Sequence, residues 1–227
     1  MKIACILPVF ALMVSAAAAP APVGDKAPRV IWCVGDSITQ SNADDDPQGS
    51  PRKALHDLLV AAGWKFSFTG HHKANPDGLP ATGATPEGDL FRYHSGISGS
   101  CIAAPKPGRT DMTKSLPEFW RTGRLAAVKP DTLLIMLGTN DVNGGGTDPA
   151  GAPARLEEFV KAVYALPGAG HPAVFIATIP PCRIEADSPA KVAAFNTALP
   201  GVVARLRAGG ADVTLVDVFA ALDKDYA

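Results

Sequence analysis

Val34-Gly35-Asp36-Ser37-Ile38-Thr39-Gln40 places a serine directly after an apolar run at residues 30–34. A short apolar run that is bounded by turn residues predicts a buried strand of a parallel sheet. Glycine lets the backbone turn sharply, so Gly35 should leave the Ser37 hydroxyl outside the carboxyl end of that strand, where open α/β folds bind ligands. Ser37 is therefore our candidate nucleophile. The alternative is an ordinary strand-exit turn in which Asp36 and Ser37 only cap backbone groups.

Apolar runs and helical periodicity alternate along the rest of the chain. Strands are expected at residues 30–35, 65–69, 131–137, 173–178 and 212–216, and helices at residues 51–62, 112–127, 152–166 and 189–208. This alternation predicts an α/β fold in which right-handed crossovers cover both faces of a parallel sheet with helices. The segment from Gly70 to Tyr93 is rich in glycine, proline and threonine and is expected to be a surface loop beside the site.

Two further motifs follow in the same order as in a known family. Gly138-Thr139-Asn140-Asp141 comes after the apolar run at residues 132–137, and Tyr93-His94-Ser95-Gly96-Ile97-Ser98-Gly99-Ser100 lies between it and the Gly-Asp-Ser motif. Together the three motifs resemble those of the SGNH (GDSL) hydrolase family. Pro51-Arg52-Lys53-Ala54-Leu55, the His-x-Gly-x-x-Gly pattern at residues 94–99 and Phe195-Asn196-Thr197-Ala198-Leu199-Pro200 are most similar to its acetylxylan-esterase-like branch. The likeness runs from about Arg29 to the end of the chain.

The resemblance implies a flavodoxin-like three-layer α/β/α fold with a five-stranded parallel sheet in the order 2-1-3-4-5. It also implies an ester hydrolase that needs no metal or other cofactor, in which Ser37 attacks the acyl carbonyl. Acyl transfer passes through a tetrahedral oxyanion that preorganised donors stabilise. The Ser37 N–H, the Gly99 N–H and the Asn140 side-chain amide would be those donors. The alternatives are a loop glycine with a positive φ at Gly99 and, at Asn140, a turn residue that bonds to its own backbone.

One block of the family is missing from the pattern. SGNH hydrolases complete their triad with an Asp-x-x-His block and a last helix after the fifth strand, whereas no histidine follows His171 here. Serine needs an adjacent base, so we expect an incomplete triad, a missing last helix and an uncovered sheet face near the first and fifth strands. Three explanations are open: a truncated chain, which we favour, a natural pseudoenzyme, or a different base. His94 is the one credible surrogate base, and its alternative is a hydrogen-bonded structural histidine.

The N-terminal segment is typical of a secretory signal. Met1-Lys2 precede an apolar stretch and residues 15–19 are small, so we interpret residues 1–19 as a cleaved signal peptide and residues 29–227 as one esterase domain. The protein is therefore expected to be secreted or periplasmic, which is an oxidising setting for its cysteines. Cys33 should be buried in the first strand. Whether Cys101 and Cys182 pair is left open.

Charge and motif content narrow the possible partners. The chain has 21 Lys and Arg against 22 Asp and Glu, which gives no electrostatic argument for nucleic acid or for a stable membrane anchor. No Cys-x-x-Cys or His-Glu-x-x-His pattern argues for a metal. The sequence predicts an exported SGNH-type esterase that deacetylates O-acetylated carbohydrate. The alternatives are a lysophospholipase or thioesterase of the same chemistry and an inactive carbohydrate-binding pseudoenzyme, and the sequence determines neither the natural acyl substrate nor the oligomeric state.

Overall fold

β1 (Arg29–Gly35) is the strand around which the sheet is built, and its apolar side chains are buried on both faces. The computed structural model describes residues 29–40, 50–73, 93–121 and 124–223. The expected signal peptide and most of the expected surface loop, residues 74–92, lie outside the described residues.

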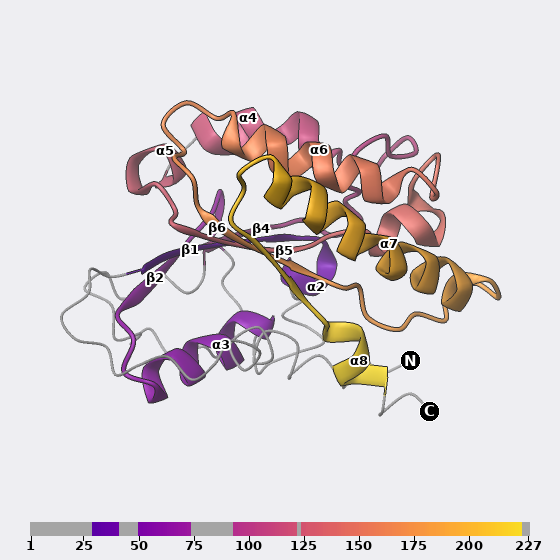
Figure 1. The fold of residues 1–227 in the computed structure, drawn as a ribbon, viewed down its shortest axis with the longest axis horizontal. Coiled ribbons are helices and arrows are strands. Elements are labelled where there is room, and N and C mark those ends of the chain that lie inside the picture. The colour runs from indigo at the N-terminus through magenta and orange to yellow at the C-terminus, as the bar shows by residue number, and fades with distance from the viewer. Residues whose placement is uncertain (1–28, 41–49, 74–92, 122–123, 224–227) are drawn as a thin grey trace.

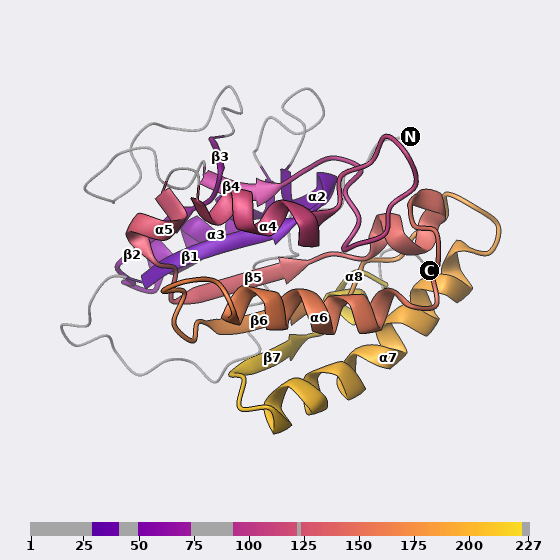
Figure 2. The same cartoon turned by 90° about the horizontal axis from the view of Figure 1, so that it is seen from above.

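A mostly parallel sheet confirms the expected fold class. β1 pairs in parallel with β2 (Phe66–Thr69) and with β5 (Thr132–Met136), and β6 (Ala173–Ala177) and β7 (Val213–Val216) follow β5. The end of β1 also pairs with β4 (Tyr93–Gly96), which carries the short antiparallel β3 (His72–Lys73). The order is therefore β3-β4-β1-β5-β6-β7 with β2 on the first half of β1, and Figure 2 shows this sheet from above. The five expected strands keep their relative order, but β3 and β4 extend the sheet beyond them.

β4 is a strand that sequence reasoning missed. His94 and Ser95 are polar, so this segment lacks the apolar run that marks the other strands, and yet both side chains are buried. Gly96 permits a close approach, since a Cβ atom there would lie 2.5 Å from the backbone nitrogen of Gln40. Ser95 and Gly96 pair with the last two residues of β1. The motif at residues 93–100, which contains Gly99, is therefore brought directly to the end of that strand.

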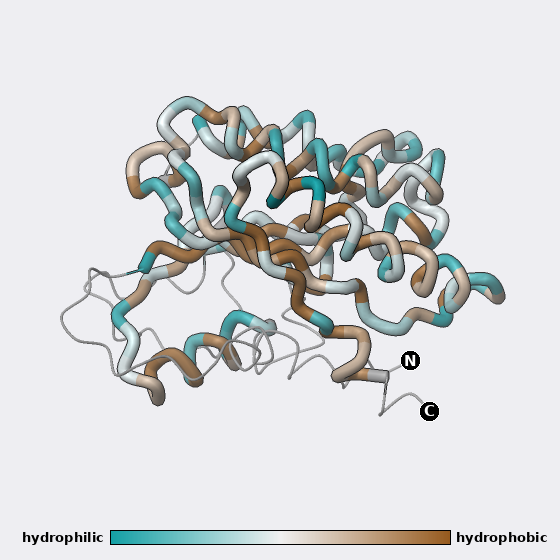
Figure 3. The backbone as a smooth tube through the Cα atoms, in the orientation of Figure 1, coloured by the Kyte–Doolittle hydropathy of each residue, from teal (hydrophilic) through white to brown (hydrophobic). Residues whose placement is uncertain are grey.

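Helices cover both faces of the sheet (Figure 1). α4 (Met112–Arg121), α5 (Arg124–Val128), α6 (Ala152–Tyr164) and α7 (Ser188–Ala208) lie on one face, and α3 (Ser50–Ala61) and α8 (Val218–Asp223) lie on the other. The alternation of side chains along β1 explains the two layers, because Trp32 and Val34 pack under α4–α7 while Ile31 and Cys33 pack against α3 and α8. Figure 3 accordingly shows that many of the hydrophobic residues lie in the strands of the sheet. None of the helices in the described ranges is long and apolar enough to cross a membrane.

α8 follows the last strand, at a point where we expected no further helix. Asp217 begins it, since its Oδ1 accepts the backbone N–H of Ala220 at 3.0 Å and the hydroxyl of Thr178 at 3.2 Å. Leu222 of α8 is buried in the same core as Val216 of β7. On the sheet face near the first and fifth expected strands, Ile31, Cys33 and Val216 are buried together with residues of α3 and α8, so the uncovered face that we expected is not seen at these residues.

The three cysteines within the described residues are free thiols. Cys33 is buried in β1, as expected, and burial raises the pKa of its thiol to about 12. Cys101 is buried and Cys182 is half-buried, and in the described part of the chain no disulfide joins them.

Leu222→Ala tests whether α8 is packed as described. Leu222 is only 3% exposed, so its truncation should lower the free energy of unfolding by about 2–5 kcal/mol. Leu58→Ala is the matched control, because Leu58 of α3 is 41% exposed and its truncation should cost less than about 1 kcal/mol. Urea unfolding followed by circular dichroism measures both variants. An equally small effect of both substitutions would contradict the packing of α8 on the sheet.

Candidate active site

Ser37 lies where β1 turns into the short helix α2 (Ser37–Gln40). Asp36 joins the two elements: its carbonyl accepts the Gln40 N–H at 2.9 Å, and its Oδ1 accepts the Ile38 N–H at 2.9 Å. The turn needs a glycine before it, since a Cβ atom on Gly35 would lie 1.9 Å from the Thr39 hydroxyl oxygen. Ser37 is half-buried at the first position of the helix, where backbone N–H groups have no intrahelical acceptor. Its N–H is therefore suited to bind an anionic oxygen.

The loop after β4 lies directly against this turn. The carbonyl of Gly35 accepts the Ile97 N–H at 3.1 Å and the Ser100 hydroxyl at 3.4 Å, and the Ser98 N–H bonds to the side-chain oxygen of Gln40. Gly99 has a φ of +74°, a conformation that side chains rarely adopt. Gly99 therefore has the positive φ that we considered as the alternative reason for a glycine at this position. This conformation is compatible with a role as an N–H donor.

Asn140 reaches the same loop from the end of β5. Gly138, two residues before Asn140, has a φ of +128°. The ring of Phe195 packs against Gly138 so closely that a Cβ atom on Gly138 would lie 2.5 Å from the ring. The Asn140 amide donates through Nδ2 to the carbonyl of Ser100 at 2.9 Å, and no bond joins this side chain to its own backbone in the described residues. Two hydrogen bonds through Ser100 therefore connect Asn140 to Gly35, two residues before Ser37.

Two buried carboxylates lie beneath these donors. Burial, and to a smaller extent the nearby Asp141, raises the pKa of Asp36 to about 6 against the opposing effect of the Ile38 N–H. Burial also raises the pKa of Asp141, which the Ile102 N–H at 3.0 Å and the Arg155 guanidinium at 3.5 Å partly offset. Perturbed carboxylates of this kind gather at functional sites more often than elsewhere.

Arg52 supports α2 from within the protein. Its guanidinium is 1% exposed and donates through Nη1 to the carbonyl of Thr39, in the last turn of α2. Burial lowers its pKa to about 10, so the side chain stays charged at neutral pH. Arg52 belongs to the Pro-Arg-Lys-Ala-Leu segment, which in the sequence is notable only as part of the family resemblance. The contact with Thr39 gives this arginine a physical role.

His94, the predicted surrogate base, is buried in β4. Its Nδ1 accepts the N–H of Gly96 at 2.9 Å, which occupies the lone pair at that nitrogen and places the proton of the neutral ring on Nε2. The ring would have to give up this bond before it could take a proton at Nδ1. Within the described ranges, no hydrogen bond joins the Ser37 hydroxyl to a histidine, so the surrogate role of His94 stays a prediction.

Ser95, which is buried, and His71, which is half-buried, form a contact that the sequence did not reveal. The Ser95 Oγ lies 2.9 Å from His71 Nδ1 and accepts the Trp32 indole N–H at 2.8 Å, while the His71 ring stacks on Phe119 at 3.6 Å. Ser95 is fully buried, so no substrate reaches its hydroxyl. The cluster therefore ties β1, β4 and α4 together and does not carry acyl transfer.

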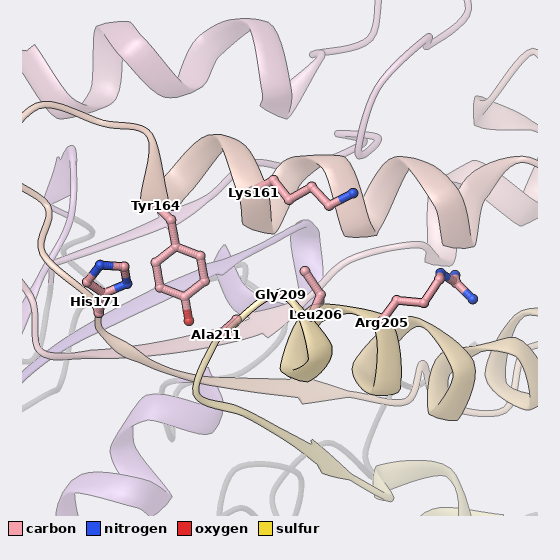
Figure 4. Close-up of a pocket in the computed structure, with 8 residues that line it drawn as sticks. Lys161, Tyr164, His171, Arg205, Leu206, Gly209 and Ala211 are labelled. Carbon is pink, nitrogen blue, oxygen red and sulfur yellow. The ribbon is translucent and has the colours of Figure 1, made fainter.

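A cavity of about 220 Å³ lies between α6 and α7 (Figure 4). His171 and Ala211 line it and precede β6 and β7, which places the cavity at the amino end of those strands, opposite the edge where Ser37 follows β1. Its two cations are already paired, because Glu157 accepts from Arg205 at 2.7 Å and lies 2.9 Å from the Lys161 ammonium. The three motifs of the candidate site lie at the other edge of the sheet.

Asp36→Asn tests the electrostatics of the turn. The carboxyl pKa rises from 3.8 to about 6 on folding, so stability from the protonated form is complete below pH 3.8 and is lost as the pH rises through about 6. Asparagine keeps an oxygen acceptor for the Ile38 N–H but cannot ionise. The wild type should therefore lose up to about 3 kcal/mol between pH 4 and 7 that the variant retains.

Urea unfolding at a series of pH values measures this difference. Asp212→Asn is the control, because it removes an exposed carboxylate and should leave the wild-type pH dependence in place. An identical pH dependence for wild type and Asp36→Asn would mean that Asp36 ionises as it does in the unfolded chain.

Known proteins are similar to this chain in sequence and in fold. A family model of GDSL-like lipases and acylhydrolases matches residues 33–227. A multidomain esterase of Ruminococcus flavefaciens is 30% identical over 155 residues, which are 66% of this chain and 19% of that protein, so the chain spans about a fifth of the relative's length.

Solved structures are similar across most of the chain. A mutant acetyl esterase with an acetate ion is 25% identical with a TM-score of 0.60, and a carbohydrate esterase family 3 protein from Talaromyces cellulolyticus is 25% identical with a TM-score of 0.59. Both comparisons cover 85% of this chain and 81% of the other. A family two carbohydrate esterase from Clostridium thermocellum in complex with cellohexaose shares the fold at 15% identity and a TM-score of 0.53, over 86% of this chain and 56% of that one.

Proposed function

Because the chain belongs to the GDSL-like lipase and acylhydrolase family, we propose that it cleaves a carboxylic ester with Ser37 as the nucleophile. The observation that supports this most strongly is the meeting of three distant motifs at the end of β1. Ser100 bonds through its hydroxyl to Gly35 and through its carbonyl to Asn140, and Gly99 lies next to it. Acyl transfer needs a nucleophile and oxyanion donors held close together in this way.

In the proposed reaction the Ser37 oxygen bonds to the acyl carbon while a base takes the hydroxyl proton and passes it to the departing alkoxide. The carbonyl oxygen becomes an oxyanion that accepts hydrogen bonds from the Ser37 N–H, the Gly99 N–H and the Asn140 amide. Water then attacks the acyl-serine with the same base assisting, which releases the acid and restores Ser37.

The proton acceptor is the part of the triad that this sequence does not supply at the family's position, since no histidine follows His171. His94 would first have to give up the hydrogen bond at its Nδ1. Our proposal is therefore a site with a nucleophile and oxyanion donors whose triad is incomplete. In well-studied serine hydrolases, loss of a triad member leaves roughly a thousandfold catalysis over water, so weak turnover is expected.

Added imidazole should raise the hydrolysis of p-nitrophenyl acetate by this chain, because it can take the place of the missing base. We expect an increase on the order of tenfold over the protein alone, after subtraction of the imidazole-catalysed background. Ser37→Ala measured under the same conditions should hydrolyse the ester no faster than imidazole alone. Fusion of a family-like Asp-x-x-His tail should raise the rate further.

Two results would contradict parts of this proposal. Ordinary enzymatic rates without imidazole that are lost in His94→Ala would show that His94 is the base and that the triad is complete in another form. No Ser37-dependent hydrolysis under any condition would remove Ser37 as the nucleophile and favour a carbohydrate-binding protein without activity.

O-acetylated carbohydrate is the substrate class that we propose. The support is the likeness, at 25% identity, to an acetyl esterase and to a carbohydrate esterase. A lysophospholipase or thioesterase would use the same chemistry on a different leaving group. Acetate release from acetylated xylan, measured against hydrolysis of p-nitrophenyl decanoate and an acyl thioester, separates these substrates. Preference for the decanoate or the thioester would contradict the carbohydrate substrate.

Asn140→Ala should lower kcat of the imidazole-assisted reaction by roughly a hundredfold and leave KM nearly unchanged, because its contact forms mainly in the transition state. Lys106→Ala, which removes an exposed side chain from a neighbouring loop, is the control and should keep both constants. An effect confined to KM would mean that Asn140 binds substrate and does not stabilise the oxyanion.

Export is a further part of the proposal, supported by the apolar, signal-like segment at residues 1–19. Mass spectrometry of protein recovered from the medium or periplasm of the expressing cells would locate its N-terminus. We expect it to lie after the run of small residues. Protein that stays in the cytosol and begins at Met1 would contradict this part.

A further inference from the structure

Arg109 lies on a loop that is fixed to the candidate site by backbone hydrogen bonds. Residues 101–111 leave the site and return to it, and the loop closes through the bond from the Cys101 N–H to the Thr110 carbonyl at 2.9 Å. The Lys106 N–H also bonds to the Gly145 carbonyl at 2.8 Å, in the turn that follows Asn140. These contacts hold the backbone of Arg109 against both the glycine loop and the end of β5.

The Arg109 guanidinium connects two of the candidate oxyanion donors. Its Nη1 donates to the Gly99 carbonyl at 3.1 Å and to the Asn140 Oδ1 at 3.3 Å. A guanidinium Nη1 carries two hydrogens, so each acceptor receives one of them. The side chain lies along Gly145, where a Cβ atom would come within 3.2 Å of its Cδ and Nε. The absence of a side chain at Gly145 thus gives the arginine its path.

These contacts determine which way the Asn140 amide faces. Its Oδ1 accepts from Arg109, and its Nδ2 donates one hydrogen to the Ser100 carbonyl at 2.9 Å. A flipped amide would set Nδ2 against the guanidinium N–H and Oδ1 against the carbonyl, which pairs donor with donor and acceptor with acceptor. The observed orientation leaves one Nδ2 hydrogen for a substrate oxygen. A cation at Oδ1 also polarises the amide, which strengthens that remaining donor.

We propose that Arg109 is a positioning residue that fixes and polarises the Asn140 amide so that its remaining N–H points at the oxyanion. This inference rests on the proposed function, because it assigns Arg109 a role in the same acyl transfer. It goes beyond the three motifs, since Arg109 belongs to none of them. Arg109 would act through the two N–H groups of its Nη1, which fix the amide, and through its positive charge, which polarises the amide.

The Asn140 side-chain amide signals in a ¹⁵N-labelled NMR spectrum test the contact without any catalysis. The pair of resonances that is lost in Asn140→Ala is assigned to this amide. In Arg109→Ala these two resonances should shift toward the values of exposed asparagines, and their hydrogen exchange should become faster. Lys106→Ala removes a cation of the same sign from the same loop and should leave them in place. Unchanged Asn140 resonances in Arg109→Ala would overturn the proposal.

Kinetics then test whether the contact matters for the reaction. With imidazole present, Arg109→Ala should lower kcat for p-nitrophenyl acetate roughly tenfold with little change in KM, and Arg109→Lys should restore part of the loss. Because Arg109 acts through Asn140, the double variant with Asn140→Ala should be no slower than Asn140→Ala alone. Additive losses, or a change in KM alone, would overturn the positioning role and assign Arg109 to substrate binding.

The two measurements separate failure of this inference from failure of the proposed function. If the Asn140 resonances respond to Arg109→Ala while no variant shows Ser37-dependent hydrolysis, the contact is as described and the esterase assignment is wrong. If hydrolysis depends on Ser37 and Asn140 while Arg109→Ala changes neither the Asn140 resonances nor kcat, the esterase assignment is supported and the positioning role is overturned.

Discussion

The carbonyl of Gly35 is the point at which the candidate site is assembled. It accepts one hydrogen bond from the Ile97 N–H and a second from the Ser100 hydroxyl, and both donors lie on the loop after β4. This carbonyl belongs to the last residue of β1, two residues before Ser37. Any displacement of the β4 loop would therefore move Gly99 and the Asn140 acceptor on Ser100 relative to the nucleophile. Acyl transfer tolerates little displacement of this kind.

Two glycines make this assembly possible. A Cβ atom at Gly35 would overlap with Thr39, and one at Gly96 would overlap with the backbone of Gln40, so the turn and the loop pack at backbone distance only because both residues are glycines. The buried carboxylates of Asp36 and Asp141 then bond to the N–H groups of Ile38 and Ile102, which fixes the two segments further. Both carboxyl pKa values are raised by burial, so the protein gives up stability in order to hold these segments.

Apolar runs explain how much of the fold could be predicted. The strand that ends at Gly35 and the one that precedes Gly138 are apolar after their first residues, Arg29 and Thr132, so their position in the sheet and the placement of Ser37 and Asn140 at its edge follow from the sequence. β4 could not be predicted, because His94 and Ser95 are polar and are buried through hydrogen bonds. α8 has only six residues, too few to show a helical period.

The polar contacts of the site are harder to predict because they join residues far apart in the chain. Arg109 lies 31 residues from Asn140, and His71 lies 24 residues from Ser95, and neither pair belongs to a motif with fixed spacing. Only the folded backbone brings such residues together. The motifs predicted the candidate site residues, whereas the structure adds the contact of Arg109 with one of them.

The structure of the protein after reaction with a methylphosphonofluoridate would test the central claim most directly, because the phosphonyl group mimics the tetrahedral intermediate. We predict a single adduct on Ser37 whose phosphonyl oxygen lies about 2.7–3.1 Å from the Ser37 nitrogen, the Gly99 nitrogen and the Asn140 Nδ2. An adduct on another residue, or a Ser37 adduct whose oxygen faces solvent away from Gly99 and Asn140, would contradict the account.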